Sequence, residues 1–376
     1  MQVPLATLKP KEERRLLRGH HWAFRNEFSQ IPELNSGDLV DVVAANRRFV
    51  GRGFYQSEGG IAVRLLSSHQ EDINQEFFER RIREARQLRE TIFPGQSIYR
   101  WVFGESDGLS GLAADRYDTV VAVHTTCAFY ESRAEMLAQS FLNTPGVQGV
   151  FFQFRPGTQC VGTVPDELIL SLDGLQIGVD LKLGQKTGMF LDQRLNSLAM
   201  RPFAKNARVL DGHSYIGLWS CHAAQAGAVS VLGVDRSEKA IEQARANAER
   251  NHVSARCQFE CADIEAVLAR GDSYNLIMLD PPALAKSRIH LTKALSRYQA
   301  LNTNAMKALE PGGILITSSC SHFVDMSAFL EMLKRAASGA GRQAQLLEFR
   351  GAPPDHPILL SMPETAYLKC ALLRIF

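Results

Sequence analysis

Short apolar runs and turn-forming residues alternate over the first part of the chain. The runs at residues 38–43, 49–55 and 61–66 have the composition of β-strands, and Asn35-Ser36-Gly37 and Gly59-Gly60 between them are typical of turns. Residues 70–91 instead carry Leu and Ile at helical spacing among charged residues, with no Gly or Pro. The pattern predicts a compact β-rich barrel over residues 1–68, followed by a linker helix.

The next segment mixes strands with a helix. Strands are predicted at residues 120–125, 149–154, 167–172 and 175–183, and a helix is predicted around residues 132–143. Together with the linker helix, we expect this segment to form an α+β domain over residues 69–184.

Residues 185–376 alternate regularly between apolar strands and amphipathic helices, which indicates a doubly wound α/β sheet. We expect strands at residues 208–211, 229–235, 258–262, 275–280, 313–318, 343–349 and 365–375. No long helix separates the last two, so they are expected to form an antiparallel hairpin at one edge. A seven-stranded sheet of this kind is typical of class I methyltransferases rather than of dehydrogenases.

The bulk properties fit an ordinary globular protein of 376 residues, of which 45% are hydrophobic and 22% charged. No apolar run approaches the roughly 20 residues that span a bilayer, and residues 1–10 lack the pattern of a signal peptide. We therefore expect a cytoplasmic protein without a membrane partner. The seven cysteines show no CxxC pairing, so the sequence indicates neither a disulfide framework nor a metal site. Cys257 and Cys261, on or beside one short strand, are expected to be packing residues.

The net charge of +2 does not by itself identify a polyanionic partner, but basic residues gather near the start of the chain. Residues 1–66 hold ten Lys or Arg against seven Asp or Glu, and four of the basic residues lie between Lys11 and Arg18 inclusive. Such a run is more often a solvated helix face than an RNA contact, so it decides nothing alone.

Acidic residues end three successive strands of the predicted α/β sheet, where ligands of such sheets bind. The first strand leads into a loop from Asp211 to Gly217, in which Gly212 and Gly217 can let the backbone approach a ligand. Asp211 suits an ammonium group such as that of methionine, Asp235 suits the hydroxyls of a ribose, and Asp263 suits an adenine amino group. No G-x-G-x-x-G is present, which disfavours a nicotinamide cofactor.

The fourth and fifth predicted strands end in residues suited to nucleophilic chemistry. The fourth ends Asp280-Pro281-Pro282-Ala283, and Ala283 stands where nucleic-acid N-methyltransferases usually have an aromatic residue. The fifth ends at Cys320, before a helix expected to begin near Asp325. Because carbon 5 of cytosine needs a thiolate added at carbon 6 before it accepts a methyl group, this pair predicts Cys320 as nucleophile and Asp280 as the residue that orients the base.

Several longer motifs lie along the chain. In order, they are Arg18-Gly19-His20-His21-Trp22, Gly51-Arg52-Gly53, Phe103-Gly104-Glu105-Ser106-Asp107-Gly108-Leu109 with Asp115-Arg116-Tyr117, residues 184–194, Pro354-Asp355-His356-Pro357 and Tyr367-Leu368-Lys369. With these motifs the chain resembles the RlmI-like family of large-subunit ribosomal RNA (cytosine-C5) methyltransferases. The likeness covers nearly the whole chain, with departures at His213, Ile216 and Leu284.

The resemblance implies a PUA-like RNA-binding domain, a central domain and a methyltransferase domain that uses S-adenosylmethionine (SAM) on ribosomal RNA. It also implies a set of site residues. The cofactor would be bound by Phe190, Arg194, Asp211, Tyr215, Gly217, Asp235, Arg236, Asp263 and Asp280, and the RNA by Arg18, Trp22 and Lys286.

Two other functions remain open at the level of sequence. One is an N-methyltransferase that acts on an RNA purine through Asp280-Pro-Pro without covalent catalysis. The other is a non-catalytic RNA-binding assembly factor that keeps the fold but binds no cofactor. The sequence also leaves open whether the chain forms a homodimer.

Overall fold

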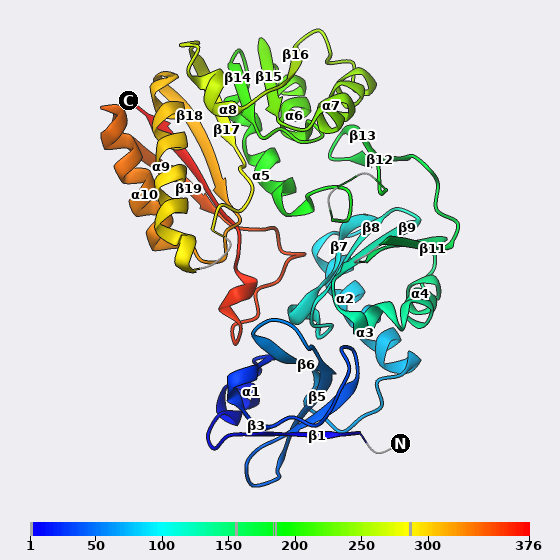
Figure 1. Ribbon diagram of the computed structural model, residues 1–376. Coiled ribbons are helices and arrows are strands. Elements are labelled where there is room, and N and C mark those ends of the chain that lie inside the picture. The colour runs from blue at the N-terminus through cyan, green and yellow to red at the C-terminus, as the bar shows by residue number, and fades with distance from the viewer. Residues whose placement is uncertain (1–2, 155–156, 183, 185, 286–287) are drawn as a thin grey trace. The chain divides into compact units, whose positions relative to one another are not determined.

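The computed structural model describes residues 3–154, 157–182, 184, 186–285 and 288–376 (Figure 1). Its contacts divide the chain into two compact units, each built from separate stretches of sequence. The first unit contains Met1–Leu168, Val179–Leu191 and Pro354–Thr365, and the second contains Ile169–Gly178, Asp192–Pro353 and Ala366–Phe376. No helix in the described part of the chain has the length and apolar character needed to cross a membrane.

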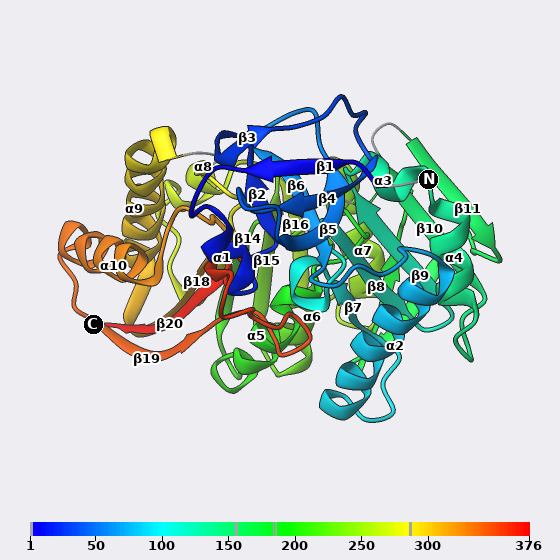
Figure 2. The same ribbon diagram turned by 90° about the horizontal axis from the view of Figure 1, so that it is seen from below.

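The first unit begins with a six-stranded sheet of order β2-β6-β5-β4-β1-β3, drawn in blue in Figure 2. The three predicted strands are confirmed, and three short strands and a helix join them. The elements are β1 (Leu5–Leu8), α1 (Glu13–Leu17), β2 (Trp22–Phe24), β3 (Phe28–Gln30), β4 (Leu39–Val43), β5 (Phe49–Tyr55) and β6 (Ile61–Ser67). Local pattern does not predict the added strands, because each is very short and depends on distant partners, as β1 does in pairing with β4.

The linker helix is α2 (Gln75–Ile92), which begins later than the predicted start at residue 70. Asn74 is the reason, since its side chain accepts a hydrogen bond from the backbone N–H of Phe77 at 3.1 Å and caps the helix. Helix α2 packs on α4 and β7, and the buried indole of Trp101 donates to the carbonyl oxygen of Ile82 in α2 at 3.0 Å.

A five-stranded sheet of order β11-β10-β9-β8-β7 follows in the first unit. Its strands are β7 (Ile98–Phe103), β8 (Leu112–Tyr117), β9 (Val120–Thr125), β10 (Gly149–Phe154) and β11 (Gly157–Gly162). The predicted helix is present as two pieces, α3 (Ala128–Glu131) and α4 (Ala134–Leu142), which join the parallel strands β9 and β10. This region is therefore α+β, as predicted.

The hairpin of β12 (Leu168–Leu172) and β13 (Leu175–Val179) groups mainly with the second unit. Asn247 of that unit accepts a hydrogen bond from the backbone N–H of Gly178 at 2.8 Å. Strand β13 ends at Val179 rather than at residue 183, because the Asp180 side chain accepts from the backbone N–H of Lys182 and turns the chain.

The second unit contains a seven-stranded sheet of order β16-β15-β14-β17-β18-β20-β19, in which β20 pairs antiparallel with β18 and β19 and the other pairs are parallel. The strands are β14 (Arg208–Gly212), β15 (Ser230–Asp235), β16 (Cys257–Cys261), β17 (Tyr274–Leu279), β18 (Leu309–Ser319), β19 (Ala344–Arg350) and β20 (Lys369–Ile375). All seven predicted strands are present. The last starts later than predicted, after the short helix η6 (Pro363–Thr365). The predicted fold class is confirmed.

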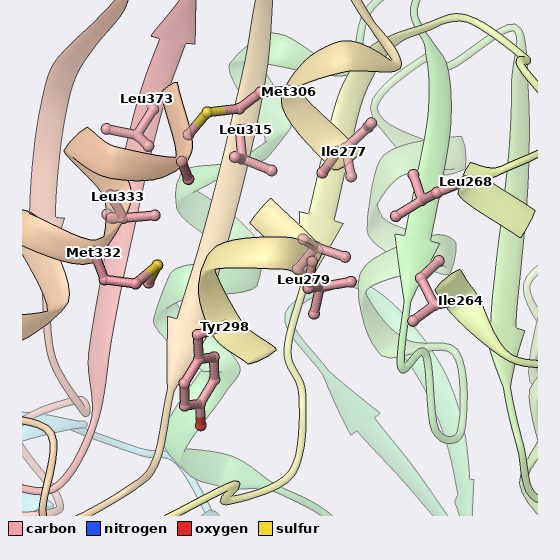
Figure 3. Packing of buried hydrophobic residues seen from close by; sticks show 14 of the residues in the cluster. Ile264, Leu268, Ile277, Leu279, Tyr298, Met306, Leu315, Met332, Leu333 and Leu373 are labelled. Carbon is pink, nitrogen blue, oxygen red and sulfur yellow. The ribbon is translucent and has the colours of Figure 1, made fainter. Parts of the chain in front are cut away.

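Helices cover both faces of this sheet. Helices α8 (Ile264–Leu268), α9 (Leu291–Lys307) and α10 (Met326–Ala340) form one layer, whose buried side chains interlock with those of the strands, as Met306 and Leu333 do with Leu315 and Leu373 (Figure 3). The opposite face carries α5 (Arg194–Ala199), α6 (Leu218–Gln225) and α7 (Glu238–Arg250). This core leaves the carboxyl ends of the parallel strands together at one edge.

A buried arginine connects several segments of the first unit. Arg89 of α2 is 0% exposed and donates to both carboxylate oxygens of Asp107, at 2.6 and 2.7 Å. It also donates to the carbonyl oxygens of Arg100 and Asp355, at 2.8 and 2.7 Å. The guanidinium group therefore holds α2, β7, the turn after β7 and the 354–365 segment together.

Replacing Arg89 with Met should destabilise the first unit by about 3–5 kcal/mol, because the change leaves the buried Asp107 carboxylate without its counter-ion. Urea unfolding measures the effect. The matched control is Arg83→Met, on an exposed face of the same helix, which should change the free energy of unfolding by no more than about 0.5 kcal/mol. Equal losses in the two variants would contradict this role for Arg89.

Candidate active site

Parallel pairing brings the carboxyl ends of five strands to one edge of the second unit's sheet. Gly212 at the end of β14 pairs with Val234 of β15 on one side and with Leu279 of β17 on the other. Leu279 in turn pairs with Thr317 of β18, while the end of β15 pairs with β16. Strand order reverses between β14 and β17, which is where ligands bind in sheets of this kind. The predicted cofactor acids lie at the ends of β14, β15 and β16, and Asp280 and Cys320 follow β17 and β18.

The loop from β14 to α6 has an uncommon backbone. His213, Tyr215 and Gly217 have φ of 65°, 48° and 79°, so two residues with a Cβ occupy the left-handed region that favours glycine. Packing as well as φ favours glycine at position 217, since a Cβ there would lie 3.0 Å from the Cβ of Ala244. Strained loops of this type gather at binding sites, where the surrounding structure holds them in place.

Gly212 has a different role from the expected one. A Cβ at this position would lie 2.8 Å from Cδ2 of Leu279 and 2.9 Å from Cδ1 of Ile264. The glycine therefore makes room for core side chains of the second unit, and its position does not itself indicate a ligand against the backbone.

Asp235 joins this loop to the start of α7. Its carboxylate accepts from the backbone N–H of Tyr215 at 3.1 Å and from that of Ser237 at 2.9 Å. Ser237 is itself the cap of α7, since its hydroxyl accepts from the N–H of Ala240 at 3.3 Å. A carboxylate has about four lone-pair positions, so Asp235 keeps acceptor capacity for the hydroxyls of a ribose.

Arg236 and Asp263 form an ion pair at the ends of β15 and β16. Asp263 also caps α8 by accepting from the backbone N–H of Glu265 at 3.0 Å. These contacts hold the pKa of Asp263 below its usual value, first through the hydrogen bond from Glu265 and then through Arg236. Asp263 is thus a fixed, ionised acceptor.

Asp211 is more deeply buried than a direct ligand contact would require. It is 3% exposed, and its carboxylate accepts from the hydroxyl of Ser220 in α6 at 2.6 Å. Burial raises the pKa of this carboxyl group to about 7, while the hydrogen bond from Ser220 opposes the shift. Asp211 therefore responds to a positive charge placed nearby, since a cation favours its ionised form.

The chemistry of this edge fits SAM. The described residues offer no hydrogen-bond partner for two buried polar atoms of the loop, Nε2 of His213 and Oγ of Ser214. The same edge carries the acceptors of Asp235 and Asp263 and the buried Asp211. A ligand with two ribose hydroxyls, an amino group and a positive charge matches this set of groups.

Asp280 is held by a buried amide. Gln193 is 3% exposed, and its side-chain N–H donates to a carboxylate oxygen of Asp280 at 2.8 Å. The side-chain oxygen of Gln193 accepts from the amide of Asn196 at 2.7 Å, which fixes the way the Gln193 amide is turned. Gln193 lies in the motif at residues 184–194, but the sequence pattern did not predict its role because residue spacing does not reveal this contact.

The loop carrying Cys320 is tied to the loop that follows Asp280. The hydroxyl of Ser321 accepts from the backbone N–H of Ala285 at 3.2 Å and lies 3.0 Å from the phenol oxygen of Tyr298. Cys320 is partly exposed, and α10 begins directly after Asp325, as predicted. Paired strands and this polar tie bring the segments of Asp280 and Cys320 together at the sheet edge.

A buried cation near Cys320 was also not predicted from the sequence. Lys369 of β20 is 5% exposed and donates to the carbonyl oxygen of Ser321 at 2.7 Å. The Tyr367-Leu368-Lys369 motif contains this residue, yet its place beside the cysteine loop depends on the antiparallel pairing of β18 with β20.

Comparisons with known proteins agree with this fold. Residues 6–68 match a PUA-like domain, and residues 204–350 match a methyltransferase domain. The chain is 33% identical to the ribosomal RNA large subunit methyltransferase I of Pseudoalteromonas atlantica, with 98% of each protein covered. It is 35% identical to the protein of that name from Shewanella denitrificans, again over 98% of each. The chain belongs to this family.

Solved structures share the family's fold. A protein described as a SAM-dependent methyltransferase from Streptococcus mutans has a TM-score of 0.86 at 20% identity, with 99% of this chain and 100% of that one covered. A methyltransferase solved in complex with SAH has a TM-score of 0.87 at 20% identity over 100% of both chains. The predicted cofactor, SAM, agrees with the methyltransferase domain match and with this complex.

Two residues that the family resemblance assigned to the cofactor lie in different units. Arg194 begins α5 in the second unit, is 3% exposed and donates to both oxygens of Asp173, at 2.6 and 2.7 Å. This pair anchors the hairpin of β12 and β13. Phe190 belongs to the first unit, where the ammonium group of Lys186 lies 5.5 Å from its ring centre.

The residues predicted to contact RNA have different surroundings. Arg18 is exposed at the end of α1, as are Lys11 and Arg14 nearby in sequence. Trp22 is partly buried, since its indole N–H donates to Glu105 at 2.7 Å. Lys286 lies outside the described residues.

The expectation that Cys257 and Cys261 are both packing residues is wrong for Cys261. Cys257 is buried, but Cys261 is exposed because it ends the edge strand β16. Cys261 is therefore useful as an accessible reference thiol.

Asp211→Asn should stabilise the protein more at pH 8 than at pH 5. The folded-state pKa of about 7 lies above the usual value of 3.8, so the folded state holds an extra proton and loses stability as pH rises towards 7. Relative to the variant, the free energy of unfolding of the wild type should fall by about 2–3 kcal/mol between pH 5 and pH 8. Urea unfolding at both pH values measures this, and a difference independent of pH would contradict the raised pKa.

Asp235→Ala should weaken SAM binding by roughly 1.5–3 kcal/mol, because it removes hydrogen bonds to a charged acceptor. Calorimetric titration measures the affinity, and circular dichroism checks the fold. Asp272→Ala, which removes an exposed carboxylate of the same unit, is the control and should leave the affinity unchanged. Unchanged binding by the Asp235 variant would remove this residue from the site.

Proposed function

We propose that this protein methylates carbon 5 of a cytosine in large-subunit ribosomal RNA, with Cys320 as the nucleophile and Asp280 as the residue that orients the base. The observation that carries the proposal is the tie between the two loops, in which Ser321 and Tyr298 connect the segment after Asp280 with the segment that holds Cys320. Family membership supports ribosomal RNA as the substrate. A cytoplasmic location follows from the same proposal.

The chemistry begins at the thiolate of Cys320, which adds to carbon 6 of the cytosine and leaves an electron pair available at carbon 5. When bound, SAM supplies an electrophilic methyl group and is left as S-adenosylhomocysteine. The ring then carries both a methyl group and a hydrogen at carbon 5. Loss of that proton to a water molecule or a carboxylate allows the carbon–sulfur bond to break, which releases Cys320 as thiolate and restores the ring.

Asp280 is suited to hold the base during these steps. One of its carboxylate oxygens accepts from the Gln193 amide, which orients the carboxylate and leaves it acceptor capacity. A contact between Asp280 and the N3 edge of the pyrimidine would stabilise the charge that develops when the thiolate adds. Gln193 would therefore act on the substrate indirectly, by fixing the orientation of the Asp280 carboxylate.

The cofactor end would complete the site. Asp235 and Asp263 would accept from the ribose hydroxyls and the adenine amino group, and Asp211 would balance the positive charge of the cofactor. The remaining cofactor residues would shape the pocket around these acceptors. Those in the second unit are Arg194, Tyr215, Gly217 and Arg236.

We assign RNA recognition to a domain at residues 1–68, which is followed by the central domain at 69–184 and the methyltransferase domain at 185–376. The PUA-like match and the exposed Lys11, Arg14 and Arg18 support an RNA-binding role for the first domain. Trp22 and Lys286 would add contacts to the RNA, and the target cytosine would leave its stack to reach Cys320.

RNA carrying 5-fluorocytidine at the target position should form a covalent enzyme–RNA adduct that requires SAM. Fluorine at carbon 5 prevents the proton loss that precedes thiol departure, so the adduct should survive boiling in detergent. Cys320→Ala should abolish both adduct and methylation. Asp280→Ala should slow methylation roughly 10²–10³-fold, the effect of losing one preorganised charge-stabilising contact.

Cys261→Ala is the matched control, since it removes an exposed thiol of the same unit and should leave adduct and methylation nearly intact. An adduct that persists in the Cys320 variant would move the nucleophile elsewhere. Methylation that survives in that variant would favour the N-methyltransferase alternative, and failure of the wild type to bind SAM would favour the assembly factor.

A further inference from the structure

Lys369 is an unusual residue for the interior of a sheet. Lysine is almost never fully buried unless it is paired, yet Lys369 is 5% exposed at the start of β20. It pairs across the sheet with Ser319, the last residue of β18, and Cys320 follows directly. The register therefore places a cation beside the segment that carries the proposed nucleophile.

The hydrogen-bond partners of its ammonium group are uncharged. Lys369 Nζ donates to the carbonyl oxygen of Ser321 at 2.7 Å and to that of Tyr367 at 2.6 Å. Backbone carbonyls satisfy two of its three donors without cancelling its charge. One of these carbonyls belongs to the residue after Cys320, so the group that carries the charge also fixes the loop.

Ionisable groups from several elements surround this loop. Tyr298 of α9 has a phenol whose pKa is raised by burial, so it is neutral near pH 7. Asp280 after β17 and Asp325 before α10 contribute carboxylates, which disfavour a thiolate. His322 lies in the loop itself, with its ring 5.7 Å from that of Tyr367.

Lys369 supplies a positive charge at neutral pH. Burial lowers its pKa to about 8, and Cys320 and Asp325 oppose the shift. Lys369 is therefore mainly an ammonium at pH 7, and a positive charge beside a thiol favours its ionised form.

We propose that Lys369 is a positioning residue for Cys320: its ammonium group holds the Ser321 carbonyl and, by its charge, favours the thiolate over the thiol. The thiol proton leaves to solvent. The inference deepens the proposed function, because it rests on Cys320 as the nucleophile of that reaction. The charge of Lys369 is the essential property, and its hydrogen bonds place that charge.

The reactivity of the Cys320 thiol towards iodoacetamide tests this without RNA or SAM. Tryptic peptide 308–334 contains Cys320 as its only cysteine, so mass spectrometry can follow its alkylation between about pH 6 and 10. Cys261 in the same samples is the reference thiol. Because its contact with Glu238 raises the pKa of Cys261 itself, the quantity compared between wild type and variants is the change in the ratio of the Cys320 rate to the Cys261 rate.

Two variants separate charge from hydrogen bonding. Lys369→Gln keeps a donor for the carbonyls but has no charge, so it should slow Cys320 alkylation at pH 7 about tenfold and shift its pH profile upward. Lys369→Arg keeps the charge and should stay within about threefold of wild type. Equal rates in wild type and the Gln variant, or equal losses in both variants, would overturn the inference. An unchanged melting temperature and unchanged Cys261 reactivity verify that each variant is folded.

Methylation gives a second readout. The rise of the methylation rate with pH should shift to higher pH in Lys369→Gln, because the thiolate then forms at higher pH, whereas Lys369→Arg should keep the wild-type profile because arginine stays charged. His322→Gln, which removes the other basic side chain of the loop, should also keep the wild-type profile. Identical profiles in wild type and Lys369→Gln would count against Lys369. Alkylation needs no substrate, so the two hypotheses can fail separately. If Cys320→Ala abolishes methylation but Lys369→Gln leaves the alkylation of Cys320 unchanged, the proposed function is retained and only the role of Lys369 is rejected.

Discussion

The parallel pairing of β14 with β17 and of β17 with β18 is the constraint on which the candidate site depends. Each strand delivers its last residue to the same edge, so the segments of Asp280 and Cys320 become neighbours although a whole helix, α9, separates them in sequence. The buried layer of α8, α9 and α10 keeps the strands in this register. The geometry of the candidate site is therefore a consequence of core packing.

Polar contacts then convert neighbouring loops into a defined site. Gln193 turns the Asp280 carboxylate, Ser321 accepts from the backbone of the Asp280 loop, and Lys369 fixes the Ser321 carbonyl. All three side chains are buried, where an unmade hydrogen bond is costly and a made one restricts motion. Such support would hold the proposed reacting groups within reach of each other.

At the strand ends proposed to bind the cofactor, by contrast, some structural features oppose folding. Burial of Asp211 raises its pKa, and the left-handed backbone at His213 and Tyr215 is strained, so both features oppose folding. A positively charged ligand would relieve the first by stabilising the ionised carboxylate. The surrounding sheet supplies the stability that allows this loop to remain in a poor conformation.

The amino-acid sequence by itself determined the fold class, all seven strands of the large sheet and the family, because hydrophobic periodicity and long motifs are local properties of the chain. It also singled out Asp235, Asp280 and Cys320 as ends of strands. Only the tertiary structure decided which side chains contact these groups and hold them in place. Gln193 and Lys369 reach the site through pairings between distant segments, and Arg194 is engaged by Asp173 from a hairpin. The burial of a single acidic or thiol side chain has no such local signature, so the raised pKa of Asp211 and the exposure of Cys261 follow from packing alone.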